Sequence, residues 1–146
     1  MEKSGFNRRA TAEQVTDGVD LSGKTVVITG VNSGLGLESM RVLALRGAHV
    51  IGAARTLEKA QQACAGVEGK TTPVACELSD LNSVVDCANF IKAMSVPIDI
   101  LMCNAGIMAP ITMSQSNGIE LQFATNHLGH FVLIKRLLEQ VKAADA

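Results

Sequence analysis

A chain of 146 residues, of which 47% are hydrophobic, is long enough for one domain with a buried core, and its length favours one domain over two. The 13 basic and 14 acidic residues are mixed along the chain, which argues against binding to nucleic acid or an anionic membrane through charge. There is no apolar stretch of about 20 residues and no apolar N-terminal leader, so neither a membrane span nor a secretory signal is predicted. Small molecules are the expected partners.

The four cysteines are widely and irregularly spaced, and no two of them form a Cys-x-x-Cys pair: Cys64, Cys76, Cys87 and Cys103. Each lies within an apolar or helical stretch. This pattern predicts free, mostly buried thiols and therefore a reducing, cytoplasmic compartment. It also argues against a zinc site, and we expect no bound metal.

The predicted elements begin after a polar N-terminal arm of residues 1–20, which carries one short helix at Thr11–Val15. Residues 21–146 form the predicted domain. Its first element is the β-branched run Lys24–Thr29, whose continuous hydrophobicity is typical of a strand covered on both faces. A glycine-rich turn follows, and then a helix at Gly34–Arg46, which ends at a glycine.

The alternation of strands and helices continues along the chain. Further strands are expected at residues 49–53, 72–76 and 98–103, and further helices at residues 57–64, 80–94 and 121–141. Thr56 and Ser79 are the expected N-caps, Pro97 ends the third helix, and residues 106–118 form an irregular loop. Short loops in such an alternation predict a parallel sheet with helices on both faces. The predicted fold is a Rossmann-type, doubly wound α/β domain with strand order 3-2-1-4.

The segment from Thr29 to Gly36, Thr-Gly-Val-Asn-Ser-Gly-Leu-Gly, lies between the first strand and the first long helix. Gly30 allows a sharp turn, Gly34 leaves room for a pyrophosphate beside the backbone, and Gly36 lets the helix lie close to the strand. The helix N-terminus offers unpaired N–H groups to phosphate oxygens. A flexible turn is the alternative, and Thr29 stands where a methyltransferase usually has an acidic residue. The position between strand and helix favours a dinucleotide site.

The end of the second strand indicates which dinucleotide is bound. NAD-specific sites place a carboxylate here for the ribose 2′-hydroxyl, whereas a nearby arginine accommodates a 2′-phosphate. This chain has Gly-Ala-Ala-Arg at residues 52–55, with no acidic residue among them. Arg55 is suited to pair with a phosphate dianion, and no carboxylate is expected beside it, which favours NADP(H) over NAD(H). A solvated arginine at the start of a helix is the alternative.

Three motifs resemble those of the short-chain dehydrogenase/reductase family: Thr29-Gly-x-x-x-Gly-x-Gly36, Asn104-Ala-Gly106 after the fourth strand, and Asn126-His-Leu-Gly-His-Phe131 in the last helix. Residues 11–15, 21–24 and 126–131 are most similar to the branch that contains retinol dehydrogenases and WW-domain oxidoreductase. The resemblance implies hydride transfer between a nicotinamide cofactor and a small carbonyl or alcohol compound. It covers about residues 21 to 135.

The resemblance also implies site residues. It places the cofactor phosphates and ribose against the glycine loop: Gly30, Asn32, Ser33, Gly34, Leu35 and Gly36. Three small or polar residues match the segment beside the ribose: Asn104, Ala105 and Gly106. Glu77 and Leu78 stand where relatives carry an aspartate, which binds the adenine amine, and a hydrophobic residue. Cys103 replaces the first asparagine of the family's Asn-Asn-Ala-Gly, which weakens one local hydrogen bond.

Asn126 matches the family's catalytic asparagine, which positions a water molecule in the proton relay to a lysine. Asparagine is a poor helix former, so its place among apolar positions of a predicted helix needs a reason. A buried structural amide is the alternative. His127 and His130 have no carboxylate or thiol at ligand spacing, so they are expected to be surface or core histidines.

The family's catalytic serine, and its tyrosine with a lysine four residues later, have no counterpart in this chain, which contains no tyrosine. Family subunits are close to twice this length. We therefore expect an incomplete domain, inactive alone, with an uncovered apolar edge at Ile98 and Ile100–Met102 that promotes self-association or a homo-oligomer. Three hypotheses are open: the cofactor-binding portion of an NADP(H)-dependent oxidoreductase, a non-catalytic NADP(H)-binding module or partner-completed subunit, and a non-functional truncation product.

Overall fold

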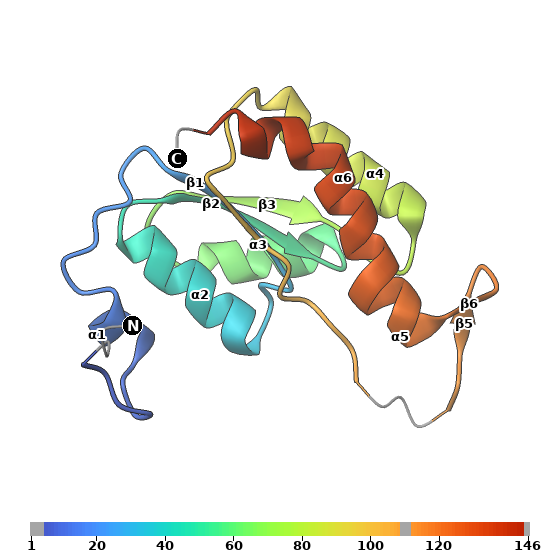
Figure 1. Ribbon diagram of the computed structural model, residues 1–146, viewed down its shortest axis with the longest axis horizontal. Coiled ribbons are helices and arrows are strands. Elements are labelled where there is room, and N and C mark those ends of the chain that lie inside the picture. Colours follow the sequence, from blue (N-terminus) through green and yellow to red (C-terminus); the bar gives the residue numbers. More distant parts are fainter. Residues whose placement is uncertain (1–4, 109–111, 145–146) are drawn as a thin grey trace.

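Four parallel strands form the central sheet of the computed structural model, which describes residues 5–108 and 112–144 (Figure 1). The strands are β1 (Thr25–Thr29), β2 (His49–Ala54), β3 (Thr71–Ala75) and β4 (Ile100–Met102). Their order across the sheet is β3-β2-β1-β4, and all neighbouring strands are parallel. The predicted order and the Rossmann-type fold are therefore confirmed.

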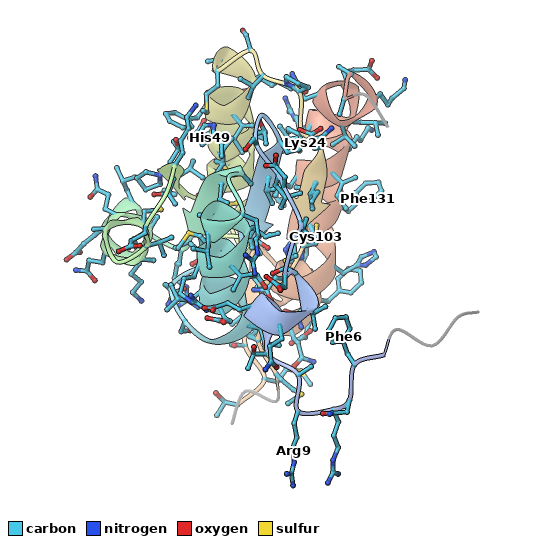
Figure 2. All side chains as sticks on the ribbon, turned by 90° about the vertical axis from the view of Figure 1, so that its left-hand side faces the viewer. Phe6, Arg9, Lys24, His49, Cys103 and Phe131 are labelled. Carbon is cyan, nitrogen blue, oxygen red and sulfur yellow. The ribbon has the colours of Figure 1, made fainter. Side chains whose placement is uncertain are left out.

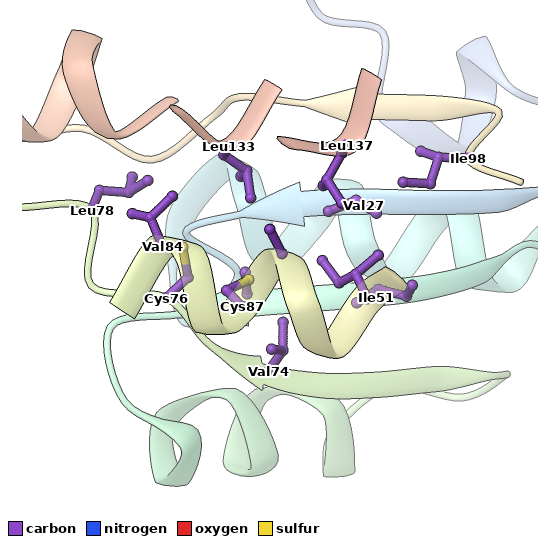
Figure 3. Close-up of a cluster of buried hydrophobic side chains, with 13 residues drawn as sticks. Val27, Ile51, Val74, Cys76, Leu78, Val84, Cys87, Ile98, Leu133 and Leu137 are labelled. Atoms are coloured by element: carbon purple, nitrogen blue, oxygen red, sulfur yellow. The ribbon is translucent and has the colours of Figure 1, made fainter. Parts of the chain in front are cut away.

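Long helices cover both faces of the sheet (Figure 1). They are α2 (Gly34–Leu45) and α3 (Leu57–Ala65) on one face, and α4 (Leu81–Ala93) and α6 (Gly129–Lys142) on the other. Strand side chains alternate between the faces, so that Val27 and Ile51 pack against α4 and α6 (Figure 3), whereas Val26 and Ile28 pack with α2 and α3. All residues of β1 are buried, which is the pattern of an interior strand.

The start of α4 differs from the prediction. Asp80, not Ser79, is its N-cap, and the Asp80 carboxylate accepts the N–H of Asn82 at 3.0 Å. The hydroxyl of Ser79 donates to Oε1 of Glu77 at 2.8 Å instead. Both residue types favour the N-cap, so the local sequence did not distinguish them. The predicted cap of α3 is confirmed, because the Thr56 hydroxyl accepts an N–H of the first turn.

The fourth strand is shorter than predicted, and one of its expected edge residues is covered. β4 contains Ile100–Met102, whereas Ile98 is fully buried in a cluster with Leu133 and Leu137 of α6 (Figure 3). The N–H of Ile98 donates to the carbonyl oxygen of Gln140 at 3.0 Å. The expectation that nothing covers Ile98 was wrong, because α6 folds back over it. Among the described residues β4 is an edge strand, and self-association there stays a prediction.

The expected loop of residues 106–118 contains part of a small hairpin. In it, β5 (Gln115–Ser116) pairs antiparallel with β6 (Ile119–Glu120). The turn between them holds Asn117 and Gly118 in left-handed conformations, with φ of 51° and 79°. Residues 109–111 of this loop lie outside the described residues. The hairpin was missed because strands of two residues carry no periodic pattern.

The helix predicted at residues 121–141 consists of three segments. The first, α5 (Leu121–Phe123), begins at Glu120, whose carboxylate accepts two N–H groups of the first turn. A π turn, η1 (Ala124–Leu128), then leads into α6. The turn is closed by the N–H of Gly129, which donates to the carbonyl oxygen of Ala124. Such turns concentrate at functional sites, and this one contains Asn126.

The N-terminal arm is fastened to α2. Its short helix α1 (Ala12–Val15) carries Glu13, whose carboxylate lies 2.6 Å from the Arg41 guanidinium. Arg46 donates to the carbonyl oxygen of Glu13 at 2.8 Å. Arg9, which precedes α1, points away from the sheet (Figure 2). Across residues 5–108 and 112–144, no helix has the length and apolar character needed to cross a membrane.

All four cysteines are free thiols. Cys64, Cys76 and Cys87 are buried, and Cys103 is exposed, which confirms the prediction of mostly buried free thiols. Burial raises the pKa of the Cys64 thiol. A hydrogen bond from Cys87 lowers the pKa of Cys76, and the same contact raises the pKa of Cys87.

Candidate functional site

A cleft of about 430 Å³ lies at the carboxyl ends of the strands. Gly30 follows β1, Arg55 follows β2, Cys76 follows β3 and Asn104 lies just beyond β4. The chain order reverses between β1 and β4, which is the switch point where open α/β sheets bind their ligands. The lining consists of Gly30, Asn32, Ser33, Leu35, Gly36, Ala54, Arg55, Lys59, Cys76, Glu77, Leu78, Asn104, Ala105, Gly106, Ile107 and Thr125.

The cleft brings together all of the residues that the sequence associates with the cofactor except Gly34. Asn126 also lies outside the lining, although its neighbour Thr125 belongs to it. Three further lining residues were not predicted from the sequence: Lys59, Ile107 and Thr125. The predicted site residues come from segments far apart in the chain, so their assembly is a property of the fold.

The three glycines of the loop differ in backbone conformation and in the space around them. Gly30 has a φ of 76°, and a Cβ there would lie 2.9 Å from Cα of Ala105. A Cβ on Gly36 would overlap the carbonyl oxygen of Gly30, so α2 begins in direct contact with the turn. Gly34 has a φ of 59°, but the space in front of it is open. Ser33 makes no capping hydrogen bond in the described structure, which leaves N–H groups of the first turn of α2 without a side-chain cap.

The loop after β4 is tied to the end of β1. The side-chain amide of Asn104 donates to the carbonyl oxygen of Thr29 at 2.9 Å. In return, the Thr29 hydroxyl oxygen accepts the N–H groups of Asn104 at 3.1 Å and of Ala105 at 3.0 Å. These bonds hold Ala105 and Gly106, which have small side chains or none, against the glycine loop on one wall of the cleft.

A carboxylate lies beside Arg55, contrary to the expectation from the sequence. Nε of Arg55 is 3.0 Å from Oε2 of Glu77, while the other carboxylate oxygen of Glu77 accepts the Ser79 hydroxyl. The pair forms because β2 and β3 are neighbours in register, with Ala54 opposite Ala75, so that the residues after them meet. The Arg55 side chain is also 61% exposed and directly precedes the N-cap of α3, so the alternative of a solvated arginine at the start of a helix stays open.

Lys59 is a second basic residue of the cleft. It lies in the first turn of α3, four residues after Arg55, where its N–H donates to the capping Thr56 hydroxyl at 3.3 Å. The cap holds the chain between the two basic residues in one conformation. Lys59 could have been predicted as a site residue from the sequence, because it lies four residues after Arg55, across the predicted start of a helix.

Asn126 is exposed and binds the backbone of Ile107. Its Oδ1 accepts the N–H of Ile107 at 2.8 Å, and its Nδ2 donates to the carbonyl oxygen of Ile107 at 2.7 Å. A buried structural amide is therefore wrong. The π turn presents this amide to the segment that follows Gly106, so Asn126 shapes the cleft through Ile107.

The two histidines of the last motif have different environments. His127 is exposed and stacks on Phe123, with ring centroids 5.1 Å apart. His130 is 6% exposed, and its Nε2 lies 2.9 Å from the Thr29 hydroxyl oxygen. No role of His130 was predicted from the sequence, because the partner of its ring lies on a strand about a hundred residues earlier.

Comparison with known proteins identifies relatives over nearly the whole chain. Short-chain dehydrogenase TIC 32 B, chloroplastic, of Brassica napus is 43% identical over 97% of this chain and 46% of its own length. The WW domain-containing oxidoreductase of Homo sapiens is 38% identical over 97% of this chain and 35% of its own length. The chain thus spans less than half of the length of these relatives.

Solved structures show the same fold. An uncharacterised protein of Mycobacterium paratuberculosis, 42% identical, superposes with a TM-score of 0.76 over 86% of this chain and 45% of its own. A metagenomic short-chain oxidoreductase in complex with NADP, 27% identical, gives a TM-score of 0.69 over 84% of this chain and 58% of its own. The sequence pattern described as "short chain dehydrogenase" matches residues 24–146. The chain belongs to the short-chain dehydrogenase family.

Proposed function

We propose that this chain is the cofactor-binding portion of an NADP(H)-dependent oxidoreductase, which transfers hydride between the nicotinamide and a small carbonyl or alcohol compound. Membership in the family supports the reaction class. The observation that carries the choice of cofactor is Arg55 in the cleft, preceded by Ala54 where an NAD-specific site has a carboxylate. A cytoplasmic location stays a prediction, since the matched relatives include a chloroplast protein.

The cleft residues fit a dinucleotide. The open space before Gly34 leaves room for a pyrophosphate, whose oxygens would accept N–H groups from the start of α2. Ala105 and Gly106 would face the ribose, and Leu78 with Glu77 would face the adenine. When bound, the cofactor supplies the hydride donor or acceptor, and the protein supplies position and electrostatics.

The ion pair of Arg55 and Glu77 bears directly on the choice between the two cofactors. A phosphate monoester carries close to two negative charges and three acceptor oxygens, so it competes well with a single carboxylate for the guanidinium. We infer that the 2′-phosphate of NADP(H) takes Arg55 from Glu77 and that Lys59 adds a second positive charge. A 2′-hydroxyl offers no charge, so NAD(H) leaves the ion pair intact.

A role of Asn126 in the proton relay stays a proposal. Its side-chain amide is engaged with Ile107 and carries no titratable proton. The chain contains no tyrosine, so within the proposed function the proton donor is supplied from outside these 146 residues. Substrate contacts are likewise proposed to come from outside this chain.

A fluorescence titration tests the proposal. The chain has no tryptophan or tyrosine, so the emission of the reduced nicotinamide itself reports binding with little protein background. We expect saturable binding of NADPH at least roughly tenfold tighter than that of NADH, as one charge-assisted hydrogen bond supplies. Equal affinities would contradict the assignment of Arg55, and no binding of either would contradict the assignment of the cleft.

A further inference from the structure

The buried ring of His130 connects two parts of the site that the chain places far apart. Its Nε2 lies 2.9 Å from Oγ1 of Thr29, at the end of β1, and its Nδ1 lies 3.1 Å from the carbonyl oxygen of Asn126. Thr29 is 1% exposed and His130 is 6% exposed, so the bond between these two side chains is shielded from water.

Counting protons on the Thr29 hydroxyl determines the direction of both bonds. A hydroxyl has one hydrogen to donate and two lone pairs that accept. The N–H groups of Asn104, at 3.1 Å, and of Ala105, at 3.0 Å, both donate to this oxygen and occupy the two lone pairs. The hydroxyl hydrogen therefore points to Nε2 of His130, which accepts it. Nδ1 then carries the ring proton and donates it to the Asn126 carbonyl.

We propose that His130, as the neutral tautomer with its proton on Nδ1, is a positioning residue that couples the wall of the cofactor cleft to Asn126. One end of the ring orients the Thr29 hydroxyl, which holds Asn104 and Ala105 in the cleft wall. The other end holds the backbone of the π turn, from which the Asn126 side chain binds Ile107. A single chain of hydrogen bonds thus runs from β1 through His130 to the loop at Ile107.

The geometry explains why a histidine is suited to this position. The ring has to accept at one end and donate at the other over the span between β1 and the π turn. Neutral imidazole does both with one rigid group. Phenylalanine would fill similar space but make neither bond, and it would leave the hydroxyl hydrogen of Thr29 without its buried acceptor.

The first test is the tautomer in the unmodified 146-residue chain. A long-range ¹H–¹⁵N correlation spectrum of the three histidines distinguishes a proton on Nδ1 from one on Nε2. We expect His130 to show a protonated Nδ1 and an unprotonated Nε2 at neutral pH, while exposed His127 serves as the internal reference. A protonated Nε2 on His130 would overturn the proposal.

The second test is a matched pair of variants at Thr29. Thr29→Val removes the hydroxyl, whereas Thr29→Ser keeps it. In Thr29→Val we expect a mixture of His130 tautomers and a shift of the Ile107 amide resonance, three hydrogen bonds away, and in Thr29→Ser neither change. An unmoved Ile107 resonance in Thr29→Val would show that the chain of bonds transmits nothing.

The link to the cleft rests on the proposed function and has its own readout. In a titration with NADPH, Thr29→Val should bind about fivefold more weakly than the unmodified chain, and Thr29→Ser about equally. If the unmodified chain does not bind NADPH, the proposed function fails, while the tautomer and the Ile107 resonance still decide the role of His130. If Thr29→Val and Thr29→Ser bind NADPH equally, His130 does not influence the cofactor cleft, and its role is limited to holding the π turn.

Discussion

Arg55 and Glu77 form an ion pair across the ends of β2 and β3, with 3.0 Å between Nε and Oε2. The pair places a carboxylate beside the residue that is proposed to recognise the 2′-phosphate. Neither partner is buried, with 61% and 29% of the side chains exposed, so the bond between them is weak and exchangeable. The preference between NADPH and NADH therefore depends on whether the cofactor carries a 2′-phosphate that displaces the Glu77 carboxylate from Arg55.

Exchanging the charge at the end of β2 should reverse the preference. In the double variant Ala54→Asp, Arg55→Ala, the new carboxylate repels the 2′-phosphate and is placed to accept a 2′-hydroxyl. We expect NADPH affinity to fall roughly ten- to hundredfold and NADH to become the tighter ligand in the fluorescence titration. A double variant that still prefers NADPH would locate the preference elsewhere in the cleft.

Removing the competing charge should favour NADPH. Glu77→Gln keeps the size of the side chain but frees Arg55, so NADPH affinity should rise by up to about fivefold while NADH affinity changes little. Glu58→Gln is the matched control, because Glu58 lies in the first turn of α3 and does not line the cleft. A loss of affinity for both nucleotides in Glu77→Gln would instead indicate that the negative charge of Glu77 is needed at the adenine.

Gly34→Val tests whether the open space before Gly34 is the pyrophosphate position. The valine side chain would fill that space, so nucleotide binding should disappear while the circular dichroism spectrum stays near that of the unmodified chain. Gly23→Val is the control, since Gly23 has a similar positive φ of 81° and open surroundings but precedes β1 and lies outside the glycine loop. Binding that survives within a few-fold would reduce the loop to a tight turn.

Asp99 should make the stability of the fold depend on pH in the acid range. Its carboxylate accepts the N–H of Thr25 at 2.8 Å and the ammonium of Lys24 at 2.9 Å, and these bonds hold the pKa of Asp99 below its usual value of 3.8. A carboxyl whose folded pKa is lowered contributes stability above its unfolded pKa and loses it as pH falls through the folded value. In urea unfolding, Asp99→Asn should therefore cost stability at pH 7 but progressively less below about pH 4. Asp86→Asn, at an exposed position of α4, should cost little at either pH.

The fold could be predicted from the sequence because each element carries a local signal. The β-branched run before Gly30 has the hydrophobicity of a buried strand, and the glycine after each early helix marks its end. The short outer parts were not predictable in this way. The β5-β6 hairpin is too short to show a periodic pattern, and the π turn contains Asn126, whose side chain binds the backbone of Ile107, 19 residues earlier in the chain.

The candidate site was predictable where its residues are contiguous and unpredictable where it depends on pairing between strands. The glycine loop and Asn104–Gly106 are local motifs, and the structure brings them together in one cleft. The pair of Arg55 and Glu77 depends on the register of β2 with β3, and the bond of His130 to Thr29 depends on α6 crossing the end of β1. The predicted strand order placed β2 beside β3 and therefore Arg55 near Glu77. No local sequence pattern indicated the contact between His130 and Thr29.

We expect the 146-residue chain, with saturating NADPH, to give no measurable turnover of aldehydes, ketones or alcohols. Asn126 supplies hydrogen bonds to Ile107 but no titratable proton, and general acid–base catalysis typically contributes about 10²–10⁴-fold. Among the described residues β4 is the edge strand of the sheet, so no further strand forms the other wall of the nicotinamide pocket, and the chain would also not hold the hydride donor and acceptor in line. The measurement is the absorbance of NADPH at substrate saturation, with Asn126→Ala as the comparison. Steady turnover that survives Asn126→Ala would mean that other residues of this chain have assembled an active site.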